Sequence, residues 1–331
     1  MAYHPAGLVD QFDRRKRKLR ISVTDRCNFK CSYCMPEHPT WVAKHKLLSF
    51  EALYQFCQFM VQQGIEHIRI TGGEPLMRQG VVHFIAQLQT LKVQGLKRIS
   101  MTTNAHYLAK YAVALQHAGL DDLNISLDSL DAEQFYQMTQ KHLTPVLEGI
   151  EAAVQAGFQI KINTVLLKGI NDNQIVPLVR WAQQQRFTLR FIEYMPLDGD
   201  QRWSAHEVVT EDEILTTLKQ YFEVNRCPEY GSEPARYYQI NGQRFGMIST
   251  ISHGFCGQCD RLRLTAQGEL YNCLFAKHGL NLAQDLQQFP INNSVLAEKI
   301  YPYVWHKAAG FHAIHAASTP TRKITMHMLG G

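Results

Sequence analysis

Six of the eight cysteines fall into two tight groups that could bind metal. These groups are Cys27, Cys31 and Cys34, and then Cys256, Cys259 and Cys273. Thiolates grouped in this way suit soft metals and iron–sulfur clusters. Each group has three thiols and no obvious fourth, so a cluster held by either would leave one iron open for a substrate or cofactor.

Zinc is the alternative metal for both groups. In the first group, His38 or His45 could complete a zinc knuckle, although the three-residue gap between its first two cysteines fits zinc poorly. In the second group, His253 or His278 could supply the fourth ligand. Spacing alone leaves zinc and an iron–sulfur cluster equally open at the second group.

Two arginines directly follow the second cysteine group. Arg261 and Arg263 lie in a short β-rich run, where side chains two residues apart share one face. Two guanidiniums side by side next to a metal are costly unless an anion meets them, and arginine pairs bidentately with phosphate. The pattern predicts a site for a phosphorylated ligand. The alternative is a surface strand with two solvated arginines.

The elements that must position these residues alternate between strand and helix as far as Pro196. The expected strands are Leu19–Thr24, His67–Thr71, Arg98–Thr103, Leu123–Leu127, Gln159–Leu167 and Thr188–Tyr194. The expected helices are Phe50–Gln63, Val81–Gln94, Tyr107–Ala118, Thr144–Ala156 and Gln174–Gln185. This alternation indicates parallel βαβ units, arranged as an open sheet or an incomplete barrel. The first cysteine group then follows the first strand, at the sheet edge where α/β active sites collect.

The alternation of strands and helices stops after Pro196. A helix is expected near Glu211–Tyr221, followed by antiparallel strands and two further helices. These strands are Arg236–Ile240, Arg244–Thr250 and Arg261–Thr265. The second half therefore has the character of a cap added to the first, more than of an independent domain.

Composition indicates a folded protein of 331 residues, with 45% hydrophobic and 19% charged residues. No apolar run is long enough to span a membrane, and the N-terminus lacks the apolar core of a signal peptide. We therefore expect a cytoplasmic protein with reduced cysteines. The two isolated cysteines, Cys57 and Cys227, are expected to be buried structural thiols.

The formal net charge is +5, and part of it lies in the run Arg14–Lys18. This run is either a solvated basic arm or a patch that attracts polyanions such as nucleic acid or a phosphorylated substrate. Charge alone does not decide between these two interpretations.

The second expected strand ends in Thr71–Pro75, which by itself would be a tight turn. Downstream of Cys27-x-x-x-Cys31-x-Tyr33-Cys34, this turn resembles the GGEP motif of the radical S-adenosylmethionine (SAM) superfamily. The resemblance implies a cluster whose open iron holds SAM, and a deoxyadenosyl radical that abstracts a hydrogen from the substrate. It also implies that the backbone of Gly72 and Gly73 contacts the amino group of SAM.

Further stretches resemble the GTP 3′,8-cyclases of molybdenum cofactor biosynthesis over nearly the whole chain. They are Leu19–Phe29, Arg69–Pro75, Asn124–Asp128, Lys161–Asn163, Phe191–Pro196 and the terminal Gly330-Gly331. The resemblance implies an α/β fold, a partial (β/α)6 TIM-like barrel over residues 1–196. It also implies a C-terminal extension of antiparallel strands and helices over residues 197–331, carrying the second cluster and the diglycine tail.

The same resemblance implies a role for each site residue. Cys27, Cys31 and Cys34 would bind one 4Fe–4S cluster, and Cys256, Cys259 and Cys273 would bind another, whose open iron meets the guanine. SAM contacts would come from Tyr33, Gly73, Ser126 and Met195. GTP contacts would come from Arg20, Arg69, Thr102, Lys161, Arg261, Leu262 and Arg263. GTP would be cyclised between its ribose 3′ carbon and C8 of guanine.

The chain terminus carries its own alternatives. In the family, Gly330 and Gly331 would support catalysis by reaching into the active site, whereas a terminus is otherwise expected to fray. Two departures from the family stand out. Ala105 replaces a usual glycine, and the segment between Cys34 and Leu47 is shortened.

The implied partners are a reductant protein, the next enzyme of the pathway and a second copy in a homodimer, with no nucleic acid and no membrane. One rival is a radical SAM peptide-modifying maturase, although such enzymes often carry a seven-cysteine auxiliary domain. A rival of another class is a zinc-stabilised nucleic-acid-binding protein that uses Arg14–Lys18.

Overall fold

The computed structural model describes residues 7–198, 200, 202–228, 232–254, 256–311, 314 and 325–330. Six parallel strands form the centre of one curved sheet and lie side by side in sequence order. They are β1 (Lys18–Ser22), β2 (His67–Thr71), β3 (Arg98–Thr103), β4 (Asp122–Ser126), β5 (Gln159–Leu166) and β6 (Thr188–Glu193). This confirms the expected succession of βαβ units.

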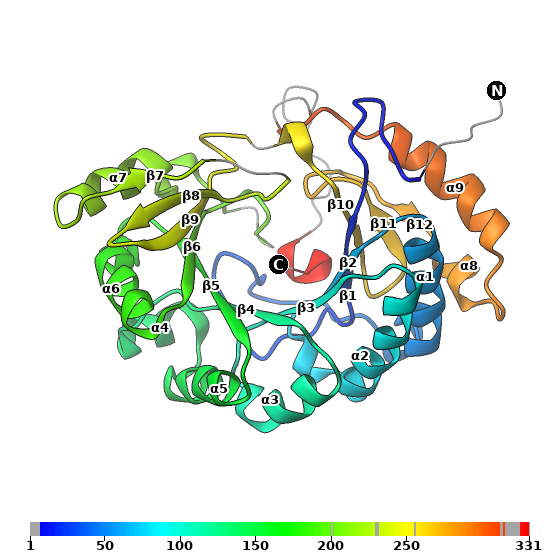
Figure 1. Ribbon diagram of the computed structural model, residues 1–331, viewed down its shortest axis with the longest axis horizontal. Helices are drawn as coiled ribbons and strands as arrows, with labels where there is room; N and C mark the ends of the chain where they lie inside the picture. The colour runs from blue at the N-terminus through cyan, green and yellow to red at the C-terminus, as the bar shows by residue number, and fades with distance from the viewer. Residues whose placement is uncertain are drawn as a thin grey trace.

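Helices cover the outer side of the curve (Figure 1). They are α1 (Phe50–Gln62), α2 (Val81–Gln89), α3 (Leu108–His117), α4 (Ala132–Thr139), α5 (Thr144–Gln155) and α6 (Ile175–Gln185). The short helix α4 was not predicted. The single helix expected over Val81–Gln94 is divided into α2 and a 3-10 helix, Thr90–Gln94, which ends at Gly95 with a φ of 114°.

The C-terminal half extends the sheet at both ends. Its strands are β7 (Asn225–Arg226), β8 (Arg236–Ile240), β9 (Gln243–Ile248), β10 (Arg261–Leu264), β11 (Glu269–Tyr271) and β12 (Leu280–Asn281). The pair β8–β9 is antiparallel, as predicted. β10 also has an antiparallel neighbour, but that neighbour is β11, a strand that was not predicted. The structure adds that β10 pairs parallel with β1, and β9 pairs parallel with β6.

The sheet stays open, because its order runs from β12 at one edge to β7 at the other. An unclosed barrel of parallel strands confirms the expected fold class. The remaining helices are α7 (Glu211–Lys219), α8 (Ala283–Gln287), α9 (Asn293–Trp305) and α11 (Met326–Leu329). The short α11, drawn in red, lies inside the curve of the sheet (Figure 1). No helix among the described residues is long and apolar enough to cross a membrane.

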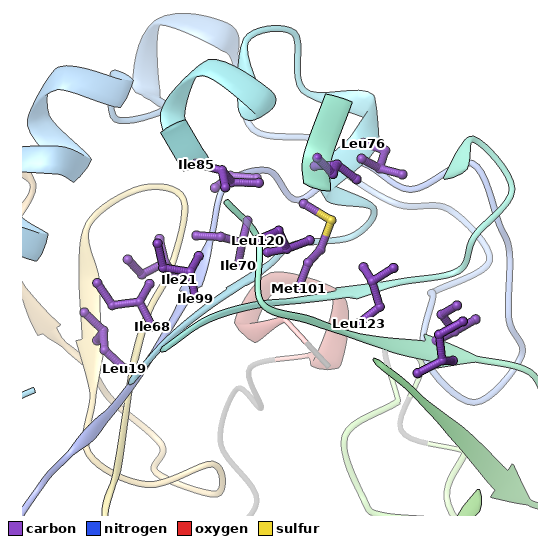
Figure 2. Close-up of a cluster of buried hydrophobic side chains, with 14 of the residues drawn as sticks. Leu19, Ile21, Ile68, Ile70, Leu76, Ile85, Ile99, Met101, Leu120 and Leu123 are labelled. Atoms are coloured by element: carbon purple, nitrogen blue, oxygen red, sulfur yellow. The ribbon is translucent and has the colours of Figure 1, made fainter. Parts of the chain in front are cut away.

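The main hydrophobic core lies between the sheet and the outer helices. Figure 2 shows Leu19 and Ile21 of β1 beside Ile68 and Ile70 of β2, with Ile85 of α2 close by. Burying each such side chain contributes about 1.5–3 kcal/mol. Because neighbouring positions on a strand point to opposite faces, the residues between these apolar ones face the inside of the curve.

The basic run Arg14–Lys18 is divided between buried, exposed and cavity positions, because Lys18 lines the cavity described below. Arg14 and Lys16 are buried, with exposed fractions of 6% and 0%. The carboxylate of Asp10 accepts from both, at 2.8 Å from Arg14 Nε and 2.6 Å from Lys16 Nζ. Only the alternate residues Arg15 and Arg17 are exposed. Internal ion pairs therefore take up two charges that the sequence assigned to solvent or to a polyanion.

The isolated cysteines differ from each other. Cys57 is fully buried in α1, which confirms its expected structural role. Cys227 is only half-buried, so the expectation of a buried thiol is wrong there. It follows β7, a two-residue strand whose residues Asn225 and Arg226 are both exposed.

Candidate active site

A cavity of about 320 Å³ lies inside the curve of the sheet. This is within the usual range for small-molecule sites, about 300–1,000 Å³. Most of the site residues expected from the sequence line it, namely Arg20, Cys27, Cys31, Tyr33, Cys34, Arg69, Gly73, Thr102, Ser126, Lys161, Met195, Arg261 and Arg263. The cavity therefore brings together residues from both halves of the chain.

The first cysteine group lies on the loop that follows β1. Burial raises the pKa of Cys27 and of Cys34 to about 12, and it raises the pKa of Cys31 well above its usual range. The carboxylates of Glu74 and Asp128 lie near enough to add to these shifts. A bound metal deprotonates its thiol ligands, so this donor set suits a metal group that brings its own positive charge.

The glycine turn after β2 packs directly against the start of that loop. The N–H of Gly73 donates to the carbonyl of Thr24 at 2.7 Å, and the N–H of Glu74 donates to the carbonyl of Arg26 at 2.8 Å. A Cβ added to Gly73 would lie 2.4 Å from Arg26 O. Glycine is therefore required here by the close approach of two backbones.

Asp128 is a cavity residue that the sequence did not single out. The hydroxyl of Tyr33 donates to its Oδ2 at 2.6 Å, and the N–H of Val165 donates to its Oδ1 at 2.9 Å. Burial raises the pKa of Asp128 to about 6. The sequence signal for Asp128 is its position two residues after Ser126, at the C-terminal end of β4, where active-site residues of α/β proteins collect.

Three arginines meet at one level of the sheet. In the strand register Arg20 of β1 lies opposite Arg69 of β2 and opposite Arg263 of β10. Burial, together with the positive charges of Arg263, Arg69 and Arg261, lowers the pKa of Arg20 well below its usual range. Burial and cationic neighbours lower the pKa of Arg69 to about 10 and that of Arg263 to about 9. So many guanidiniums in one buried place need a polyanion.

Lys161 of β5 and Arg190 of β6 extend this basic wall. Arg190 is 6% exposed and donates to Asn163 Oδ1 at 3.0 Å and to Asn124 Oδ1. The sequence analysis missed Arg190. Because it is paired with Asn163, two positions after Lys161, strand alternation could have placed it on the same inner face.

Leu262 behaves differently from the arginines on either side of it. Its side chain is fully buried in the hydrophobic core, on the opposite face of β10. The cavity lining therefore includes Arg261 and Arg263 but not Leu262. Strand alternation could have separated Leu262 from the two arginines, but the resemblance carried the three over as one stretch.

The second cysteine group lies behind the arginine pair. Cys256 begins a 3-10 helix. Cys259 and Cys273 lie close enough to Arg263 for their charges to raise its pKa, against the lowering by burial. Burial opposes ionisation of Cys259, but the charges of Arg261 and Lys307 lower its pKa to about 6. In contrast with the first group, this donor set has cations around it, which suits thiolates holding a metal group.

In the described part of the chain, neither the cysteine groups nor the histidines near them in the sequence form a site for a single metal ion. Among the residues that the structure describes, no three histidine, cysteine or acidic side chains converge closely enough for a single metal ion. His38, His45, His253 and His278 all belong to that described part.

The C-terminal tail enters the same space. The carbonyl of Gly330 accepts from Arg263 Nη1 at 3.0 Å, and the N–H of Met326 donates to the carbonyl of Leu197 at 3.0 Å. Gly330 has a φ of 76°, and an added Cβ would lie 2.0 Å from Thr71 Oγ1. Gly331 lies outside the described residues.

Ala105, the residue that departs from the family's usual glycine, has a φ of 62°. Alanine in this left-handed region costs about 1–2 kcal/mol. The turn is retained because Ala105 is fully buried and its N–H donates to Thr103 Oγ1 at 3.1 Å.

An open parallel barrel with a three-cysteine loop after its first strand defines a radical SAM protein. The model of the Radical SAM superfamily matches residues 21–182, and the model called Molybdenum Cofactor Synthesis C matches residues 187–313. A GTP 3′,8-cyclase of Staphylococcus epidermidis is 40% identical over 279 residues, 81% of this chain and 82% of the relative. One of Staphylococcus aureus is 37% identical over 340 residues, 98% of this chain and 99% of the relative. The chain belongs to the GTP 3′,8-cyclase family.

Solved structures agree with this fold. Streptococcus suis SuiB bound to S-adenosylmethionine has a TM-score of 0.60 at 15% identity, covering 85% of this chain and 68% of that one. SuiB bound to the precursor peptide SuiA has a TM-score of 0.61 at 14% identity, covering 85% and 67%. At these identities the likeness shows the fold alone. The family membership replaces both rival functions, the peptide maturase and the zinc-stabilised nucleic-acid-binding protein.

Proposed function

We propose that the chain is a lyase that converts GTP to (8S)-3′,8-cyclo-7,8-dihydroguanosine 5′-triphosphate, the first step of molybdenum cofactor biosynthesis. The observation that carries the proposal is the tier Arg263–Arg20–Arg69. These three arginines lie in a cavity that the first cysteine group also lines. Cys259 and Cys273 of the second cysteine group lie close to Arg263. One site can therefore hold a nucleoside triphosphate close to radical chemistry.

Cys27, Cys31 and Cys34 would hold a 4Fe–4S cluster with SAM on its open iron. When bound, this pair supplies a carbon-centred radical that removes hydrogen from the ribose 3′ carbon. Tyr33, Gly73, Ser126 and Met195 line the same cavity and would contact SAM. Because the N–H of Gly73 already donates to Thr24, its carbonyl is the group left to accept from the SAM amino group.

The triphosphate would be held by the basic wall. Arg20, Arg69, Arg261 and Arg263 supply guanidiniums, and Lys161 lies across the cavity on β5. Arg190 joins this set by its position next to Asn163. Thr102 is a neutral cavity residue that would contact the nucleoside. Leu262, whose side chain is buried in the core, would contribute through its backbone.

Cys256, Cys259 and Cys273 would hold the second 4Fe–4S cluster, with its open iron facing the guanine. The cations beside Cys259 support this assignment, because they stabilise thiolate ligands. The guanine base would then be oriented at one end and the phosphates at the other. Such two-point binding brings the ribose 3′ carbon and C8 into one fixed geometry.

Gly330 and Gly331 would support catalysis from the tail. The Gly330 carbonyl accepts a hydrogen bond from Arg263. The tail would therefore contact the same guanidinium that binds the phosphates. We propose that residues 1–196 form the radical-generating barrel and residues 197–331 the extension that carries the second cluster. A reductant protein, the next enzyme of the pathway and a second copy of this chain are the proposed partners.

The proposal is tested by iron content and nucleotide binding in anaerobically reconstituted protein. Two clusters require about eight irons per chain, and replacing Cys256, Cys259 and Cys273 by alanine should halve that number. The same triple variant should lose its preference for guanine, so its affinities for GTP and ATP would be equal. Unchanged iron content and unchanged preference for GTP in that variant would contradict the second cluster site.

A further inference from the structure

Lys307 is a buried lysine without a carboxylate partner in the described part of the chain. It is 2% exposed. Its ammonium donates to Cys259 Sγ at 3.3 Å, to the carbonyl of Asn272, and to the carbonyl of Arg261 at 3.4 Å. A buried ammonium is costly unless an anion lies against it. Among these partners, only the Cys259 sulfur can carry a negative charge.

Two other buried cations beside this loop, Lys16 and Arg14, are balanced differently. Lys16 pairs with Asp10 at 2.6 Å and also donates to the carbonyl of Cys259 at 2.9 Å. Arg14 pairs with the same carboxylate and donates to the carbonyl of Cys256 at 2.7 Å. Arg14 and Lys16 therefore bind the backbone of the cysteine loop, and Asp10 balances their charge. Of these three cations, only Lys307 contacts a cysteine sulfur.

Lys307 also joins two separate segments of the second cysteine group. The Asn272 carbonyl that it binds immediately precedes Cys273, whereas Cys259 lies on the far side of β10 and β11 in the chain. A single side chain thus connects one cysteine with the backbone beside another. A lysine with three donors can make these contacts at once, because each N–H has its own acceptor.

We propose that Lys307 is a positioning residue of the second cysteine group. It holds Cys259 and the segment before Cys273 in place, and it supplies the positive charge that the thiolates of a bound iron–sulfur cluster require. This inference rests on the proposed second cluster. Hydrogen bonds to cluster sulfurs and nearby charges set reduction potential and metal retention, so both properties should depend on this lysine.

The test uses the full-length chain with Cys27, Cys31 and Cys34 replaced by alanine, so that only the second cluster is present. In this background Lys307→Met is compared with Lys299→Met, which removes an exposed lysine paired with Asp285 at 2.7 Å. An EPR-monitored redox titration gives the midpoint potential, and a chelator gives the rate of iron loss. Lys307→Met should shift the potential to more negative values and lose iron about 10–100-fold faster. Lys299→Met should change neither.

Two further variants keep the test decisive if Lys307→Met does not fold. Lys307→Arg keeps the positive charge and should restore most of the potential. Lys16→Met removes a backbone contact but no sulfur contact, so iron loss should accelerate while the potential moves less than in Lys307→Met. Equal potential and equal iron loss in Lys307→Met and the unsubstituted chain would overturn the inference. An unsubstituted chain that never holds a cluster at Cys256, Cys259 and Cys273 would overturn the proposed function and this inference with it.

Discussion

Arg20 and Arg263 lie directly opposite each other on adjacent parallel strands, although they are 243 positions apart in the chain. β1 lies in the first half of the chain and β10 in the second half. Their pairing therefore brings a guanidinium from each half of the chain to one level of the cavity. Two like charges held this way oppose folding, and their attraction for a polyanion explains why such an arrangement is kept.

The first prediction concerns phosphate binding at this pair. Arg20→Ala and Arg263→Ala should each weaken GTP binding by about 1.5–3 kcal/mol, the range for a lost charged hydrogen bond. Lys97→Ala is the matched control, because Lys97 is an exposed lysine that pairs with Glu66 at 2.9 Å. Isothermal titration calorimetry with GTP measures the effect. Equal affinity in all three variants would place the triphosphate elsewhere.

The second prediction follows from the same repulsion in the absence of ligand. Removing one charge from the tier, as in Arg20→Met, should raise the free energy of unfolding of the ligand-free chain by about 0.5–2 kcal/mol. Urea unfolding without nucleotide measures it. GTP should stabilise the unsubstituted chain more than this variant. A ligand-free variant that is less stable than the parent would show that Arg20 is compensated within the fold.

The third prediction concerns the first cysteine group. Cys27→Ala should abolish formation of deoxyadenosine from SAM, because the cluster would lose a ligand and its electron would not reach the sulfonium. Cys57→Ala, at a fully buried cysteine of α1, should keep that activity. Chromatography of anaerobic reaction mixtures measures deoxyadenosine. Its retention in Cys27→Ala would count against a cluster at this loop.

The fourth prediction concerns the tail. Gly330→Ala places a methyl group against Thr71, where an added Cβ would lie 2.0 Å from Oγ1. The tail must then leave Arg263, so product formation should fall steeply while deoxyadenosine is still formed. Deleting Gly330 and Gly331 should have the same effect without loss of the fold. Met328→Ala, at a half-buried neighbour, is the control. Normal product formation after the deletion would remove the tail from the mechanism.

The fifth prediction concerns pH. Burial raises the pKa of Asp128 from 3.8 to about 6, so its contribution to stability is present below pH 3.8 and is lost as pH rises to about 6. Asp128→Asn should remove this dependence and raise stability at pH 7 by up to about 3 kcal/mol. Urea unfolding of the apoprotein from pH 4 to pH 8 tests it, with the exposed Asp212→Asn as control. Parallel pH profiles for the parent and Asp128→Asn would contradict the prediction.

The barrel strands and both cysteine groups could be predicted from sequence, because each is a local signal. The strand β1 alternates Leu19 and Ile21 with Arg20, and its register in the structure follows that alternation. Likewise, the three-residue spacing around Cys27 is visible without any tertiary contact. Motif resemblance then supplied the cavity residues that composition alone did not distinguish.

What sequence could not predict depends on contacts between distant segments. The parallel pairing of β10 with β1 has no local signal, because residues 17 to 21 and residues 260 to 264 meet only after folding. For the same reason Arg14 and Lys16 resemble a solvated basic run until Asp10 and the cysteine loop surround them. Lys307 gives no sequence signal at all, since only the packing after α9 brings it to Cys259.

The most direct test of the account is product analysis after anaerobic reconstitution with iron and sulfide, followed by incubation with SAM, a reductant and GTP. Mass spectrometry should find deoxyadenosine together with a product of the same mass as GTP, which is the cyclised dihydro nucleotide. ATP in place of GTP should give no such product. Deoxyadenosine without any conversion of GTP would keep the radical SAM chemistry and contradict the proposed substrate.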